Sequence, residues 1–86
     1  MEPINQQFYS FTVLYEADPD GGYVASVPAL PGCHTQGETL EEAEMNIKEA
    51  AELYLESLAA EKKEIPEETR VLQGTVRVPL SFSRIS

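Results

Sequence analysis

The chain has 86 residues, enough for one small domain, and 42% of them are apolar, a fraction typical of globular proteins rather than disordered ones. Its net charge of −9, from 15 acidic and six basic residues, argues against direct binding to a phosphate backbone; the acidic residues serve either a basic protein partner or solubility alone. No membrane span, signal peptide or internal disulfide is expected, because there is no apolar run of roughly 18 residues, no basic start and one cysteine, so we expect a cytoplasmic protein.

Two antiparallel strands are expected first, over residues 8–17 and 23–28. The earlier segment alternates with the period of a half-buried strand, and one face carries Tyr9, Phe11, Val13 and Tyr15. The sequence ADPDGG between the segments is typical of a tight turn, because proline fixes one dihedral angle and glycine permits positive φ. We therefore predict a β-hairpin.

A loop with a well-defined turn sequence and a short third strand follow the hairpin. Pro28 and Pro31 end the second strand because they cannot donate to a ladder, and Gly32 permits a tight bend. The third strand is predicted over residues 33–36, and Gly37 stops it.

A long amphipathic helix is predicted over residues 40–60. The sequence TLEE, starting at Thr39, matches a capping box, and Pro66 rules out continuation of the helix through that point. The apolar stripe recurs at steps of three and four residues, through Leu40, Ala43, Ile47, Ala51, Tyr54 and Leu58. Among the carboxylates off this stripe, Glu49, Glu52 and Glu56 are the candidate partner-binding residues, on charge and expected exposure alone.

A fourth strand is predicted over residues 71–80, joined beside the first strand by a right-handed crossover through the helix. The expected fold is α+β: a single β-β-β-α-β domain over residues 1–86, with a small mixed sheet of three to four strands in the order 3-2-1-4. One helix covers one face of that sheet, and the other face is solvated or covered by another chain.

No residue pattern argues for catalysis, a cofactor or a metal. Cys33 and His34 are adjacent, and adjacent side chains of an extended chain point to opposite faces, which prevents activation of the thiol by the imidazole. The acidic group at Glu16, Asp18 and Asp20 is too short for a calcium loop, so we interpret it as part of the turn.

Residues 22–58 resemble the HicB-like antitoxin family. The pattern is a Gly-Tyr start, a strand, a P-x-LPGC-x-T-x-G-x-T segment and a helix with regularly placed Ala and Leu. The residues that carry it are Gly22, Tyr23, Pro28, Leu30, Pro31, Gly32, Cys33, Thr35, Gly37, Thr39, Ala43, Ile47, Ala50 and Leu58.

This resemblance implies a truncated ribonuclease-H-like fold without the catalytic acids, and a small basic messenger-RNA-cleaving toxin of the HicA type as the partner. Many members carry a C-terminal DNA-binding segment. Residues 75–86 are similar to the opening strand of a ribbon-helix-helix unit but are followed by no helices, so autonomous DNA binding is not expected. The free sheet edge predicts a homodimer or larger assembly. The alternatives are an orphan regulatory or structural domain without a toxin and, less favoured, a residual metal-dependent nuclease.

Overall fold

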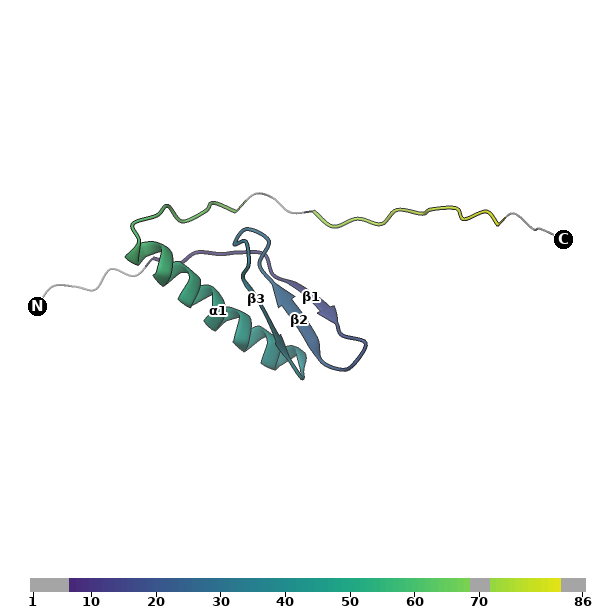
Figure 1. Ribbon diagram of the computed structural model, residues 1–86, viewed down its shortest axis with the longest axis horizontal. Helices are drawn as coiled ribbons and strands as arrows, with labels where there is room; N and C mark the ends of the chain where they lie inside the picture. Colours follow the sequence, from purple (N-terminus) through teal and green to yellow (C-terminus); the bar gives the residue numbers. More distant parts are fainter. Residues whose placement is uncertain (1–6, 69–71, 83–86) are drawn as a thin grey trace, which may run out of the picture.

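A computed structural model of the chain describes residues 7–68 and 72–82 (Figure 1). Three short strands and one long helix follow one another: β1 (Leu14–Ala17), β2 (Tyr23–Ser26), β3 (His34–Gly37) and α1 (Leu40–Ala60). The strands form one antiparallel sheet in the order β1-β2-β3, and α1 packs against β3 and β2. The fold is therefore of the α+β class, with one helix on one face of a small sheet.

The hairpin of β1 and β2 is closed by the expected turn. Leu14 lies opposite Ser26 and Ala17 lies opposite Tyr23 in the ladder. Within the turn the Asp18 N–H donates to the Gly22 carbonyl over 2.9 Å, and Gly22 itself has φ of +81°. Glycine tolerates this left-handed conformation without a steric penalty, which is why the turn sequence specifies the hairpin.

The connection between β2 and β3 is a compact loop held by its own backbone. The Val27 N–H donates to the Cys33 carbonyl over 3.0 Å, and the Cys33 N–H donates to the Leu30 carbonyl over 2.9 Å. The Leu30 side chain is fully buried, and Gly32 has φ of +84°. The loop therefore turns the chain between two strands and also contributes a side chain to the core.

Helix α1 begins where the capping box predicted and is tied to the sheet near its start. The Thr39 hydroxyl accepts from the Glu42 N–H over 3.1 Å, which satisfies one of the free donors of the first turn. The Asn46 side-chain amide donates to the Gln36 carbonyl of β3 over 2.9 Å. The Glu61 N–H still donates to the Ser57 carbonyl, but the chain leaves the helix at Lys62, whose φ is +58°.

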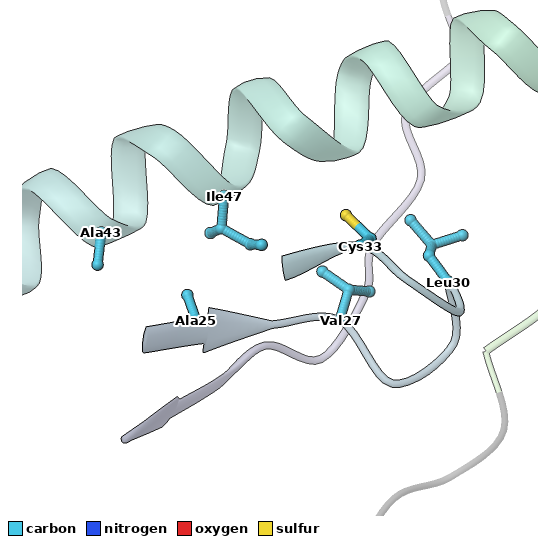
Figure 2. Close-up of a cluster of buried hydrophobic side chains, with 6 residues drawn as sticks. All are labelled: Ala25, Val27, Leu30, Cys33, Ala43 and Ile47. Carbon is cyan, nitrogen blue, oxygen red and sulfur yellow. The ribbon is translucent and has the colours of Figure 1, made fainter. Parts of the chain in front are cut away.

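The core is small and lies between α1 and the sheet. Ala43 and Ile47 of the helix point toward Ala25 of β2 and the side chains of the β2–β3 loop (Figure 2). The buried residues are Ala25, Val27, Leu30, Cys33, Ala43 and Ile47. Phe11 and Val13, from the segment before β1, are half-buried against this cluster, whereas Tyr9 and Tyr15 on the same predicted face remain exposed.

The helix limits and the β3-β2-β1 order agree with the sequence predictions, but the strands are shorter and the fourth strand is absent from the sheet. β1 covers only the last four residues of the expected range 8–17, because β2 offers four residues for pairing before its chain turns away. Residues 72–82 are exposed and form no ladder, and residue 71 lies outside the described residues. All pairings between the described strands are therefore antiparallel, and no parallel crossover joins β3 to a fourth strand.

Candidate partner-binding surface

The outer face of α1 carries the three predicted partner-binding carboxylates. Glu49, Glu52 and Glu56 are all exposed. Their spacing of three and four residues places them on one side of the helix, and Glu49 lies about 200° around the helix from the buried Ile47. The helix phase therefore turns these carboxylates directly away from the sheet.

Two large apolar side chains lie among these carboxylates. Met45 is 72% exposed and Leu53 is 59% exposed. Met45 precedes Glu49 by four residues, and Leu53 follows Glu49 by four, so all three are neighbours on the helix surface. We refer to Met45, Glu49, Glu52, Leu53 and Glu56 as the outer helix face. An apolar centre with charged surroundings is the usual composition of a protein-binding surface.

Sequence reasoning did not identify Met45 and Leu53 as surface candidates. The sequence did contain a signal for them, because both are apolar residues outside the apolar stripe that faces the sheet. Such residues remain exposed when the helix packs on the sheet. The carboxylates were identified by charge, and charge alone does not find the apolar part of an interface.

The β2–β3 loop holds the cysteine and the histidine in separate environments. Cys33 is 5% exposed and belongs to the core, whereas His34 is exposed at the start of β3. Burial raises the pKa of the Cys33 thiol above its ordinary value of 9.0, so the neutral, unreactive form predominates at neutral pH. The geometry therefore supports a structural role for this loop.

An acidic hollow of about 430 Å³ lies at the turn that closes the β1–β2 hairpin, beside the start of α1. Asp18, Asp20, Glu38 and Glu42 contribute to its lining. The Asp18 side chain accepts from the Asp20 N–H over 2.8 Å, so this carboxylate stabilises the turn, as the sequence indicated. Glu16 lies on β1 and is not among the lining residues.

Within residues 7–68 and 72–82, no three or more His, Cys, Asp or Glu side chains lie close enough together to hold a metal ion. In the same part of the chain, no helix combines the length and the apolar character needed to cross a membrane.

Comparison with known proteins gives a consistent result. Residues 11–79 match the model of the HicB_like antitoxin of bacterial toxin-antitoxin systems. A UPF0150 protein of Synechocystis is 53% identical over 68 residues, which cover 79% of this chain and 86% of the relative. A UPF0150 protein of Thermoplasma acidophilum is 55% identical over 56 residues, 65% of this chain and 81% of the relative.

A UPF0150 protein of Thermotoga maritima is 48% identical over 52 residues, which cover 59% of this chain and 69% of the relative. The family match extends from the segment before β1 to the segment after α1, and so includes the sheet, the β2–β3 loop and the whole helix. The chain belongs to the HicB-like antitoxin family.

Proposed function

We propose that this protein is a non-catalytic cytoplasmic antitoxin that binds a small basic, messenger-RNA-cleaving toxin of the HicA type through the outer helix face. Membership of an antitoxin family supports a role in toxin neutralisation. The observation that carries the choice of surface is the exposure of Met45 and Leu53 among three outward-facing carboxylates on one rigid helix.

Charge is the first argument for this surface. A ribonuclease must hold a phosphate backbone, and it does so mainly with lysine and arginine side chains. A helix face with carboxylates at positions 49, 52 and 56 offers negative charge to those same side chains. Complementary charge accelerates the encounter and favours one orientation of docking, and occupation of the basic surface excludes RNA.

Apolar contact is the second argument, because exposed ion pairs contribute little affinity by themselves. Each such pair is worth about 0.5 kcal/mol, whereas the energy of an interface is concentrated in a few buried apolar or aromatic anchors. Met45 and Leu53 supply such anchors, and methionine adapts its shape easily to a partner surface. The helix below them is fixed by Ala43 and Ile47, so binding requires little reordering.

The test is co-purification of this chain with the small basic protein encoded beside it, followed by calorimetric titration and an RNA-cleavage assay. The triple variant Glu49→Gln/Glu52→Gln/Glu56→Gln is expected to weaken binding about tenfold, because three pairs of about 0.5 kcal/mol add to roughly that factor. The variant Leu53→Ala is expected to weaken binding further by increasing the dissociation rate.

The matched control is Glu38→Gln/Glu64→Gln/Glu67→Gln, which removes the same charge from exposed positions outside α1. Equal weakening of binding by the two triple variants would contradict the choice of the outer helix face, but it would not contradict the proposal that the partner is a toxin. A monodisperse protein that binds no neighbouring basic protein would contradict the toxin partner itself and favour the orphan regulatory domain.

A further inference from the structure

Residues 72–82 form an extended strip that pairs with none of β1, β2 and β3. Every residue in it is exposed, and alternate positions are apolar. The apolar members are each 76–83% exposed: Leu72, Val76, Val78, Leu80 and Phe82. Alternation with period two is the pattern of a strand with one buried face, and this strip has nothing to bury that face against. We call residues 72–82 the C-terminal strip.

Within residues 7–68 and 72–82, no strand pairs with the outer edge of β1. β1 pairs with β2 on one side only, and α1 packs over β2 and β3. Tyr15 lies opposite the fully buried Ala25 and so faces the helix side of the sheet, yet Tyr15 is 38% exposed. A further strand at this edge would satisfy the free backbone groups of β1 and would bring its apolar face beside Tyr15.

Acidic and basic residues are unevenly distributed along the chain. All 15 acidic residues and three lysines lie within residues 1–68, whereas residues 69–86 contain three arginines and no acidic residue. Arg77 is the arginine within the C-terminal strip. The strip therefore brings one positive charge to a strongly acidic body, and its extended backbone offers hydrogen-bonding groups to the β1 edge.

The chain does not close the strip onto its own sheet. The Glu68 carboxylate, at the end of the segment that follows α1, accepts from the Thr12 N–H of the segment that leads into β1. From there the strip runs away from the sheet (Figure 1), and the chain measures 82 Å along its longest axis. Its radius of gyration is 18.8 Å, against about 12 Å for a compact chain of this length.

We propose that the C-terminal strip of one copy adds to the β1 edge of a second copy, and that the second copy reciprocates. The same two surfaces are used on both copies, so the contact closes into a two-fold dimer and leaves neither a strip nor a β1 edge unpaired. The proposal concerns self-association and is independent of toxin binding.

Light scattering on the purified full chain tests the dimer. The expected mass is twice 9.5 kDa for the unmodified chain. The variant Val76→Asp/Val78→Asp places charge on the apolar face of the strip and is expected to give 9.5 kDa. The control Gln73→Asp/Thr75→Asp adds the same charge to the opposite face and is expected to remain dimeric. Circular dichroism of α1 checks that both variants retain the folded body.

Exchange of the strip between copies is tested by cross-linking in a Cys33→Ala background. One preparation carries Glu16→Cys on β1, and the other carries Thr75→Cys on the strip. After mixing, a short bis-maleimide is expected to give a band at twice the chain mass, absent from either preparation alone. A monomeric chain with the strip folded onto its own β1, or a strip that pairs only when a basic protein is added, would overturn the proposal.

Discussion

Gly37 is the point of closest approach between the sheet and the helix. It ends β3, and its Cα lies against the first turn of α1. A Cβ built at this position would lie only 2.8 Å from the Cα of Ala43 and 2.8 Å from the carbonyl carbon of Glu42. The backbone of α1 can therefore reach β3 only because residue 37 has no side chain.

We expect Gly37→Ala to lower the free energy of unfolding by about 1–3 kcal/mol, the usual cost of forcing an extra carbon into a packed interface. Urea denaturation followed by circular dichroism measures this change. Gly74→Ala is the matched control, because a Cβ at residue 74 meets nothing within 4 Å. Equal effects at the two glycines would contradict the close contact.

Cys33 makes stability depend on pH at the alkaline end. Burial raises the pKa of its thiol above 9.0 in the folded chain, so the folded state holds the proton more tightly than the unfolded state. The associated stabilisation is complete below pH 9.0 and is lost as pH rises through the folded-state pKa.

Denaturation of the unmodified chain is therefore expected to show a larger loss of stability between about pH 8 and about pH 10 than the Cys33→Ala variant. The variant retains every tyrosine and lysine, so the difference between the two curves isolates the thiol. Parallel curves for the two proteins would show that Cys33 ionises equally well in the folded and unfolded chains.

The elements differ in how well their limits can be predicted from sequence. The limits of α1 depend on local features, namely the Thr39 cap and an apolar period of three and four residues, and the structure reproduces residues 40–60. Strand pairing depends on a partner that is distant in sequence. Residues 8–13 alternate correctly and orient Phe11 and Val13 toward the core, but β2 is too short to pair with them.

The C-terminal strip shows the same limit of sequence reasoning. Its alternation predicted a strand beside β1, whereas the described residues are extended and lie outside the sheet, because alternation alone does not specify a pairing partner. On the outer helix face, the exposure of Glu49, Glu52 and Glu56 follows from helix phase, whereas the exposure of Met45 and Leu53 is recognised only once the packed side of α1 is known.

At the start of α1, Thr39→Ala is expected to lower the free energy of unfolding by about 1 kcal/mol, because the Glu42 N–H loses its acceptor. Thr39→Ser keeps a hydroxyl at the same place and is expected to retain most of that energy. Thermal or urea unfolding of the three proteins measures the difference. If alanine and serine destabilise alike, the hydroxyl is not the source of the cap energy.

At the scale of the whole molecule, net charge predicts how association responds to salt. For the proposed strand exchange, raising NaCl from about 0.05 M to about 0.5 M is expected to accelerate association, because salt screens the repulsion between two copies that each carry a net charge of −9. Dissociation is expected to change less, since it depends on the apolar face and the backbone pairing.

Mixing of two fluorescently labelled preparations in a stopped-flow instrument measures both rates. Arg77→Gln removes a positive charge from an acidic chain, so it is expected to increase the salt dependence without abolishing the dimer. An association rate that is the same at both salt concentrations would show that charge does not influence how two copies associate.

The exposed C-terminal strip also has a consequence for turnover. Extended, accessible backbone is what proteolytic enzymes cut most readily, and a strand that is paired in a sheet resists them. In the proposed dimer the strip is paired, so a solitary copy is expected to be cut first, with exposed Arg77 as a site for a trypsin-like enzyme. Survival of the protein would rise with its own abundance, because each newly synthesised copy protects another from degradation.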